Sequence, residues 1–311
     1  MNTFKKILFF ADGAKGETIA LQRAAELALH NKASLTVMDV VAEVDSNDAR
    51  LKPTLKRLQQ ALIKERKTAL EALVKELFHE GGTPSIKIHV AAGKNYIGVI
   101  QTIIQKRFDL LVKSANKHNA VAATLFGNTD ISLLRKCPCP VWIIKPSRKK
   151  RIDTILAAVD LTETSEAQQL ARQILNLSAG LANLEKSDLH VLNAWQPNFE
   201  PHVRTLIGRQ EYADMMKMLK ENSHASLRAL IQSTADLPVN GAMSQHLEKG
   251  HAEVVIPKFV KDHKIDLLIM GTMSRTGIPG FLIGNTAEKV LDAVDCSVLT
   301  LKPSGFKSPV T

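Results

Sequence analysis

The feature that most constrains this chain is an internal duplication. DLLVKSANK, which begins at Asp109, matches DLLIMGTMS, which begins at Asp266, 157 residues later. The same shift carries the Gly-Asn-Thr at 127–129 onto the Gly-Asn-Thr at 284–286. KILFFAD near the start matches TILAAVD at a shift of 148. Because the shift grows from 148 to 157 along the repeat, the second copy is longer, and we expect its extra residues in the polar stretch NAWQPNFEPH. Repeats of about 150 residues predict two similar domains.

Each copy alternates strand and helix signals. In the second copy, the short apolar run Ile155–Val159 is typical of a strand that is covered on both faces. Apolar residues then recur at helical spacing from Ala167 to Leu181. Five such strands separated by four helices predict parallel pairing, right-handed crossovers and helices on both faces. We therefore predict two doubly wound α/β domains, each with a parallel sheet of order 3-2-1-4-5.

The domain boundaries follow from the repeat. We predict a first domain over residues 1–146, a linker over 147–152, a second domain over 153–304 and a tail over 305–311. The linker prediction rests on the polar run KPSRKKR, which separates the last strand signal of one copy from the first of the next.

The composition is ordinary for a globular protein, with 45% apolar and 23% charged residues. No uncharged apolar run reaches the ~18 residues of a transmembrane helix. The amino-terminal apolar run ends at Asp12 without a cleavage-site pattern, so we predict a buried strand there and not a signal peptide. Three cysteines favour a reducing compartment, and we expect a cytoplasmic protein. Because Cys137 and Cys139 lack a second pair of soft ligands, no metal site is predicted.

The net charge of +10 is uneven. Residues 1–145 carry 22 Lys and Arg against 13 Asp and Glu, whereas residues 146–311 carry 19 against 18. The basic residues are spread along amphipathic helical segments with few aromatic residues between them, which favours a solvated helix face over a nucleic-acid surface. We expect neither nucleic acid nor a membrane as a partner.

The strand order predicts where a ligand binds. In open parallel sheets, ligands lie beyond the carboxyl ends of the strands, where the strand order reverses. In the second copy this point lies between the strands that end at Asp160 and at Met270-Gly271. Asp160 could accept hydrogen bonds from ribose hydroxyls or an adenine amine, and Gly271 would let the backbone approach a ligand closely.

The tripeptide at 284–286 lies at the amino end of the next predicted helix. Free N–H groups and the helix dipole favour an anion there. The alternative is a helix that caps itself, because Asn285 and Glu288 form a pair similar to a capping box. The residues alone leave both interpretations open.

These motifs resemble the universal stress protein family, and most closely its tandem two-domain bacterial form, the E type. The resemblance extends to about residue 303. It implies flavodoxin-like domains of the adenine nucleotide alpha hydrolase-like type, with an Asp after strand 1 and Gly-x2-Gly-x9-Gly-Ser/Thr between strand 4 and helix 4. It also implies that Val141–Ile144 and Val298–Leu301 pair or pack, so that the chain forms a pseudo-dimer within itself, and that tandem chains could form a homodimer.

The resemblance assigns an adenine-nucleotide site to the second copy. Asp160 and Val191 would face adenosine, and Met270 and Gly271 would line the ribose. The implied site consists of Asp160, Leu161, Val191, Met270, Gly271, Ser274, Arg275, Gly284, Asn285 and Thr286. Two positions depart from the family motif, because Ser274 replaces the second glycine and Asn285 replaces the final Ser/Thr. The ligand that the resemblance implies is ATP or another adenine nucleotide, with Mg²⁺.

The first copy has lost much of this pattern. Lys113, Ser114 and Lys117 stand where the second copy has Met270, Gly271 and Ser274. The equivalent positions of the first copy are Asp12, Val37, Lys113, Ser114, Lys117, Gly127, Asn128 and Thr129. We expect a degenerate site that serves packing. The alternative is an anion site of different design, because a lysine can hold a phosphate as a point charge.

The histidines do not predict catalysis. His89 and His246 occupy matching places on the third strands, and the apolar alternation puts them on the more polar face. His251 starts the following helix. No Ser–His–Asp or Cys–His arrangement is evident, so no catalytic residue is predicted. The sequence thus favours a stress-linked ligand-sensing or interaction module. A slow ATPase, and a nucleotide-free scaffold for another small or hydrophobic ligand, remain as alternatives.

Overall fold

A computed structural model describes most of the chain. The described residues are 4–46, 48, 50–78, 84–116, 126–147, 149, 151–196, 206–233, 241–273 and 283–310. The chain divides into two compact units, which we describe separately: unit 1 is Met1–Lys150 with Lys307–Thr311, and unit 2 is Arg151–Phe306.

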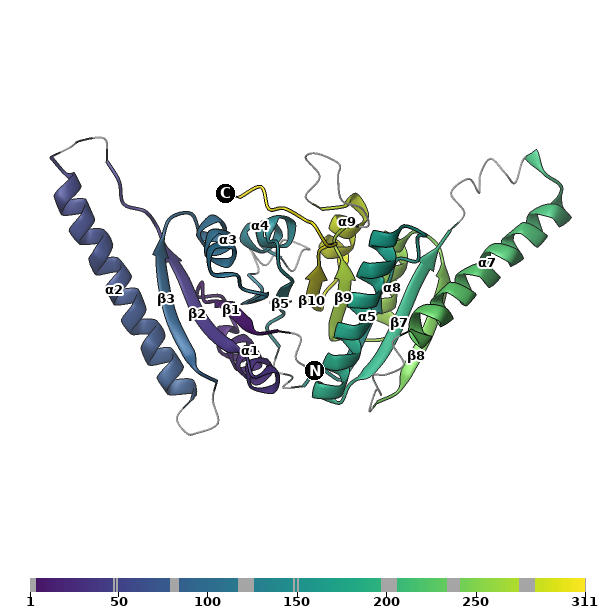
Figure 1. Cartoon of the computed structure of the whole chain (residues 1–311), viewed down its shortest axis with the longest axis horizontal. Helices are drawn as coiled ribbons and strands as arrows, with labels where there is room; N and C mark the ends of the chain where they lie inside the picture. Colours follow the sequence, from purple (N-terminus) through teal and green to yellow (C-terminus); the bar gives the residue numbers. More distant parts are fainter. Residues whose placement is uncertain are drawn as a thin grey trace. The chain divides into compact units, whose positions relative to one another are not determined.

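Unit 1 is a five-stranded parallel α/β unit (Figure 1). Its elements are β1 (Lys6–Phe10), α1 (Glu17–Asn31), β2 (Ser34–Val41), α2 (Lys52–Leu77), β3 (Ile86–Ala92), α3 (Asn95–Lys106), β4 (Leu110–Ser114), α4 (Asn128–Lys136) and β5 (Val141–Ile144). The strand order is β3-β2-β1-β4-β5, with every described pairing in the unit parallel. This confirms the predicted order 3-2-1-4-5.

Unit 2 repeats the arrangement. Its elements are β6 (Thr154–Ala158), α5 (Ser165–Glu185), β7 (Asp188–Trp195), α7 (Arg209–Gln232), β8 (Met243–Lys249), α8 (Ala252–Asp262), β9 (Leu267–Gly271), α9 (Asn285–Ala293) and β10 (Ser297–Leu301). The strand order is β8-β7-β6-β9-β10, again parallel. The predicted insertion NAWQPNFEPH overlaps the end of β7, and its part beyond residue 196 lies outside the described residues.

Both sheets are covered on two faces. Right-handed crossovers place α1 and α2 on one face of the unit 1 sheet, and α3 and α4 on the other, where α3 contacts α4. In unit 2, α8 contacts α9 in the same way. The central strands are therefore mainly apolar, and Ile7, Leu8 and Phe9 of β1 are completely buried. Burial on both faces explains why these strands read as continuous apolar runs.

The duplication extends to unusual backbone angles. Gly93 and Gly250, which follow β3 and β8, have φ angles of 143° and 144°. Arg107 and Lys264, which follow α3 and α8, are both left-handed, with φ angles of 56° and 50°. L-residues avoid these angles unless the surrounding structure requires them. The two copies thus share turn geometry as well as element order.

The long helix α2 has little buried surface of its own. Among its 26 residues, only Leu70 is fully buried. In Figure 1 the helix α2 lies on the outer side of β3. No helix in the described part of the chain is both long enough and apolar enough to cross a bilayer.

Candidate functional site

Each unit has one place where the strand order reverses. In unit 1 it lies at the carboxyl ends of β1 and β4, which pair through Phe10 and Lys113. In unit 2 it lies at the ends of β6 and β9, which pair through Ala158 and Met270. These are the two crevices that the strand order predicts for a ligand, and the side chains that line them differ.

A buried lysine fills the crevice of unit 1. The Lys113 side chain is 0% exposed, and its Nζ lies 3.0 Å from Oδ2 of Asp12 and 2.9 Å from Oδ1 of Asp130. Nζ also donates a 2.7 Å hydrogen bond to the carbonyl of Ser114. Lys113 comes from the end of β4, Asp12 follows β1 and Asp130 lies in the first turn of α4. One ammonium group therefore bridges the three elements that surround the crevice.

Backbone and amide groups complete this cluster. Asn116 donates from Nδ2 to Asp12 at 2.8 Å and from its backbone N–H to Asp130 at 2.8 Å. The Gly127 N–H, at the amino end of α4, donates to Oδ2 of Asp130 at 3.2 Å. Burial raises the pKa of Asp130, while Lys113 and these N–H donors act in the opposite direction. The Asp130 carboxylate thus occupies the helix end where an external anion would be favoured.

A second ion pair covers the neighbouring strand ends. Arg66 of α2 pairs with Asp39 of β2 through its Nε, and its Nη2 donates to the Ala11 carbonyl at 3.0 Å. Burial raises the pKa of Asp39, although the Arg66 hydrogen bond lowers it. Our sequence reading missed Arg66 as part of the crevice. The signal was Asp39, a carboxylate inside the apolar strand SLTVMDVV, which needs a cationic partner when buried.

The predicted residues of unit 1 lie as follows. Val37 is buried in β2, and the Ser114 hydroxyl donates to the Lys15 carbonyl at 2.8 Å. Gly127 caps α4, and Asn128 and Thr129 form its first turn. Lys117 lies outside the described residues. Lys113 is bound to two carboxylates, and an anion site of different design in this unit stays an open alternative.

Unit 2 has no such ion-pair cluster among its described residues. Met270 and Ala287 stand where unit 1 has Lys113 and Asp130, and both are buried and uncharged. Asp160 is exposed, and its Oδ1 accepts hydrogen bonds from the Thr162 backbone at 3.0 Å and from the Thr162 hydroxyl at 2.6 Å. A carboxylate at the rim and a neutral interior distinguish this crevice from that of unit 1.

The strand ends beside it are also neutral. Asn193 takes the place of Asp39, and its Nδ2 donates to the Val159 carbonyl at 3.0 Å. That carbonyl corresponds to the one that Arg66 contacts in unit 1, so one amide replaces an ion pair. Val191 is completely buried in β7, and Leu161 is half-buried after Asp160.

Gly271 has a structural role at the end of β9. A Cβ at this position would lie 2.7 Å from Cδ2 of Leu170 on α5. The glycine therefore allows close packing of α5 whether or not a ligand is bound. The next residue, Thr272, is buried, and its carbonyl accepts from the Gly284 N–H at 2.8 Å, which brings the amino end of α9 to the end of β9.

Of the two interpretations that the sequence left open, the one in which Asn285 is the capping residue of its helix does not match the structure. Gly284 is the capping residue, with φ −73° and ψ 145°, and α9 begins at Asn285. A glycine has no side chain to accept from the first-turn N–H groups, and Asn285 and Thr286 are both exposed. The amino end of α9 thus has no side-chain cap, and the Gly284 N–H donates to the Thr272 carbonyl where the Gly127 N–H of unit 1 donates to Asp130. Ser274 and Arg275 lie outside the described residues.

Comparison with known proteins identifies the relatives of this chain. The model of the universal stress protein family matches residues 3–145 and again residues 151–302. The chain belongs to the universal stress protein family. It is 27% identical to universal stress protein E of Photorhabdus laumondii, and the match covers 100% of this chain and 98% of that protein. Universal stress protein E of Escherichia coli K12 is 28% identical, with the same coverage.

A solved structure agrees with the fold. A functionally unknown protein from Pseudomonas aeruginosa PAO1 superimposes with a TM-score of 0.70 at 27% identity, covering 97% of this chain and 94% of that one. These matches over the full length confirm the resemblance to the tandem E type. This universal stress protein thus has two different crevices. The interior of the unit 2 crevice holds uncharged side chains, whereas the interior of the unit 1 crevice holds Lys113 paired with two carboxylates.

Two histidines of this universal stress protein, His190 and His246, lie within β7 and β8 and away from the carboxyl ends of these strands. His246 on β8 and His190 on β7 contact each other, with Nε2 and Nδ1 3.0 Å apart, and both lie beside His263 and Phe259. The ring of His246 is half-buried and packs against Phe259 of α8. His89 is likewise half-buried, which lowers its pKa. Exposed His251 is the capping residue that precedes α8. In the described part of the chain, no three His, Cys, Asp or Glu side chains are placed to hold a metal ion.

Proposed function

We propose that this universal stress protein is a ligand-sensing module that binds one adenine nucleotide per chain, in the crevice of unit 2. The observation that carries the proposal is the contrast between the two crevices. Lys113, Asp12 and Asp130 occupy the interior of one, whereas the equivalent interior of the other holds Met270 and Ala287. An anionic ligand would meet the buried carboxylate of Asp130 in unit 1, whereas the equivalent position in unit 2 is the uncharged Ala287.

The residues of unit 2 suit the parts of a nucleotide. Asp160 is exposed at the rim and would accept hydrogen bonds from ribose hydroxyls in place of Thr162. The side chains of Val191 and Met270 form an apolar floor for the base. The amino end of α9, which has no side-chain cap, would donate backbone N–H groups to phosphate. A Mg²⁺ ion bound with the nucleotide would neutralise part of the phosphate charge.

Titration calorimetry with ATP and Mg²⁺ tests the proposal. We expect one nucleotide per chain and a roughly 10- to 100-fold weaker affinity for Asp160→Ala, because hydrogen bonds to a charged group contribute about 1.5–3 kcal/mol. Glu163→Ala is the matched control, since it removes another exposed carboxylate from the same loop. Asp160→Ala is a cleaner test than a change at Gly271, where any side chain would displace Leu170.

A second variant transplants the closed crevice. Met270→Lys with Ala287→Asp places the unit 1 ion pair in unit 2, and we expect it to abolish ATP binding while the chain stays folded. Ala293→Asp adds a carboxylate at the other, exposed end of α9 and serves as the control. Undiminished ATP binding by the transplanted variant would refute the proposed site, and a parent chain that binds no adenine nucleotide would refute the function.

A further inference from the structure

Three histidine rings gather on one face of the unit 2 sheet, within the strands and not at their carboxyl ends. Nδ1 of His190 on β7 lies 3.0 Å from Nε2 of His246 on β8. His263 follows the last residue of α8, and its ring centroid lies 5.4 Å from that of His190 and 5.6 Å from that of His246. Folding thus brings together three imidazoles that are far apart in the sequence.

Phe259 of α8 is a shared platform for these rings. Its side chain is buried, and the ring of His263 stacks on it with centroids 3.9 Å apart and planes inclined by 17°. The rings of His190 and His246 also contact it, with centroid separations of 5.8 and 4.7 Å. One buried aromatic ring therefore restricts the positions of all three imidazoles.

The separations of the rings match those of imidazoles that bind one metal ion. Zn–N bonds of about 2.0–2.1 Å in tetrahedral geometry place two ligand nitrogens ~3.3 Å apart and their ring centroids ~5.2 Å apart. The nitrogens of His190 and His246 are 3.0 Å apart, so an ion needs them to move by only a small amount. The three centroid separations are 5.2, 5.4 and 5.6 Å.

His263 can supply the third nitrogen by turning its ring. In the described conformation the three side chains are not placed to hold an ion together. His263 is exposed, however, whereas the half-buried His190 and His246 are held by their contact with each other. Rotation about the broad χ2 torsion of an exposed histidine meets little resistance. The exposed side of the cluster also gives an ion a path from solvent.

Carboxylates on the same strands favour a cation at this place. Because side chains alternate along a strand, Asp188 lies on the face of His190 and Glu248 on the face of His246. Both carboxylates are exposed, and each interacts electrostatically with its neighbouring histidine. Two negative charges therefore flank the imidazole pair and would offset the charge of a divalent ion.

Unit 1 does not repeat the cluster. The duplication places His89 of β3 at the position of His246, Thr36 of β2 at that of His190 and Lys106 of α3 at that of His263. One imidazole thus remains where unit 2 has three, and the lysine adds a positive charge that opposes a metal ion. The cluster is therefore a property of unit 2 and not a consequence of the shared fold.

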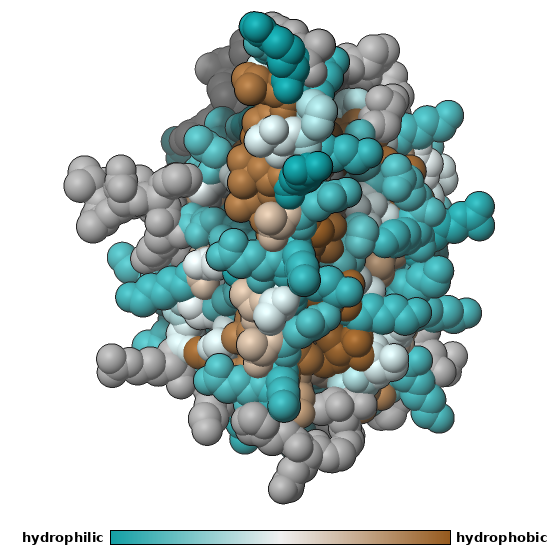
Figure 2. Space-filling view, turned by 90° about the vertical axis from the view of Figure 1, so that its left-hand side faces the viewer, coloured by the Kyte–Doolittle hydropathy of each residue, from teal (hydrophilic) through white to brown (hydrophobic). Residues whose placement is uncertain are grey.

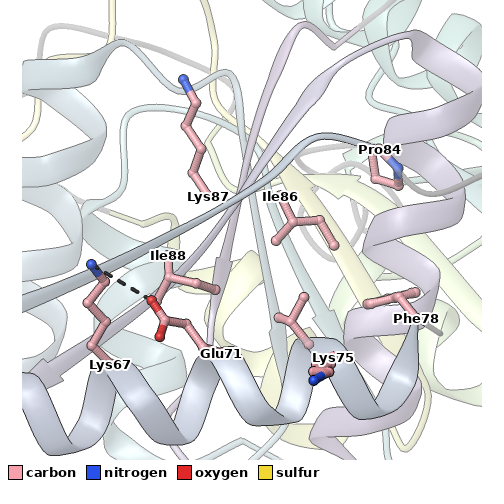
Figure 3. Close-up of a pocket in the computed structure, with 9 residues that line it drawn as sticks. Lys67, Glu71, Lys75, Phe78, Pro84, Ile86, Lys87 and Ile88 are labelled. Carbon is pink, nitrogen blue, oxygen red and sulfur yellow. Dashed lines mark ion pairs between the residues drawn. The ribbon is translucent and has the colours of Figure 1, made fainter.

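The α2 side of β3 offers no metal ligands of this kind either. Figure 2, which looks onto the α2 side of unit 1, shows brown apolar side chains between teal hydrophilic ones. In Figure 3, Ile86 and Ile88 point towards α2 and Lys87 points away from it, so His89 lies on the face opposite α2. The described residues that line the hollow between α2 and β3 include no histidine or cysteine.

We propose that unit 2 binds one divalent transition-metal ion of the zinc class through His190, His246 and His263, with water in the fourth position. Imidazole nitrogens are preferred ligands of this class, and three histidines with one open position are a known zinc arrangement. One of the paired nitrogens donates its hydrogen to the other in the metal-free form. On binding, that hydrogen moves to the other nitrogen of its ring, so that both rings present a lone pair to the ion.

Titration calorimetry with ZnCl₂ tests the site, on the full chain without a polyhistidine tag and after removal of metals by a chelator. We expect one Zn²⁺ per chain. His190→Thr with His263→Lys, which installs the residues of unit 1, should weaken the affinity at least about tenfold, since even partners outside the ligand shell contribute roughly 10–100-fold. His251→Gln, which changes an exposed histidine of the same unit, should leave the affinity unchanged.

Cobalt tests whether the ion is coordinated by all three rings. Co²⁺ held by three histidines and one water in tetrahedral geometry absorbs strongly in the visible range, and we expect these bands in the parent chain. His263→Gln should remove most of this absorption, and His251→Gln should retain it. Circular dichroism of each variant shows that it is folded.

Three results would overturn the proposal. The first is a parent chain that binds no Zn²⁺, and the second is equal Zn²⁺ affinity in the parent and in the His190→Thr, His263→Lys variant. The third is visible Co²⁺ absorption that persists in His263→Gln, because the ion would then be held without the third histidine.

Discussion

Lys113 is the residue that separates the two halves of this protein most sharply. Its ammonium group neutralises two carboxylates in a crevice where Oδ1 of Asp12 is buried and accepts no hydrogen bond from a described residue. Removing one partner of a buried ion pair leaves the other charge uncompensated, whereas a wholly apolar replacement can be nearly neutral. The cluster therefore makes unit 1 dependent on all of its members.

We expect Lys113→Met to lower the free energy of unfolding of unit 1 by about 3–5 kcal/mol, because Asp12 and Asp130 would lose their cation. Urea unfolding followed by circular dichroism, with separate transitions for the two units, measures this. The double variant Lys113→Met with Asp130→Ala carries the residues of unit 2 and should recover part of the loss. A double variant as unstable as the sum of the two single changes would show that the pair does not interact as described.

At the level of elements, a cluster of rings joins β7, β8 and the end of α8 in unit 2, with half-buried His190 and His246 beside exposed His263. His263 stacks on Phe259 at 3.9 Å, and both lie beside His190 and His246. Burial lowers the pKa of His190 and of His246, and neighbouring histidines lower both values further. The folded pKa values thus lie below the unfolded value of about 6.5, so the unfolded chain binds these protons more readily.

Because the unfolded chain binds these protons more readily, we expect acid to lower the free energy of unfolding of unit 2. The contribution of the cluster is present above pH ~6.5 and is lost as the pH falls below that value. We expect the urea midpoint of unit 2 to fall between pH 7.5 and pH 5.5, and the fall to be smaller in His190→Gln with His246→Gln. His251→Gln, which alters an exposed histidine of the same unit, is the control. An equal fall in the double variant and the parent would contradict the assignment.

For the molecule as a whole, the duplication has produced two units with one shared fold and different interiors. A ligand that binds only the folded form stabilises the unit that holds it, by about 2.7 kcal/mol at 100 times its Kd. In this chain that effect should be confined to unit 2. Unit 1 is already neutralised by its own side chains and should gain nothing from ATP.

Hydrogen exchange measured by mass spectrometry tests this asymmetry. We expect ATP with Mg²⁺ to slow amide exchange in peptides that contain the ends of β6 and β9, at Ala158 and Gly271, and to leave those at Phe10 and Ser114 unchanged. The Asp160→Ala variant, which should show little protection at the same ATP concentration, is the control. Protection at Phe10 and Ser114 would place a nucleotide in the crevice of unit 1.

Periodicity and repetition were sufficient to predict the class of fold. The apolar runs of β1 and β6 and the repeated Gly-Asn-Thr are local patterns, and parallel strands separated by helices permit few arrangements. The strand order itself was an assumption, in line with the family resemblance. The closed state of the first crevice was also visible as Lys113 at a position that is Met270 in the other copy.

The partners of that lysine could not be predicted in the same way. Asp130 lies 17 residues from Lys113 and Asp12 lies 101 residues away, and only folding brings the three side chains together. The start of α9 also involves a distant contact, because its capping residue is Gly284, whose N–H donates to the carbonyl of Thr272. Local spacing determines which elements form, whereas the charges and donors that remain for a ligand depend on contacts between distant parts of the chain.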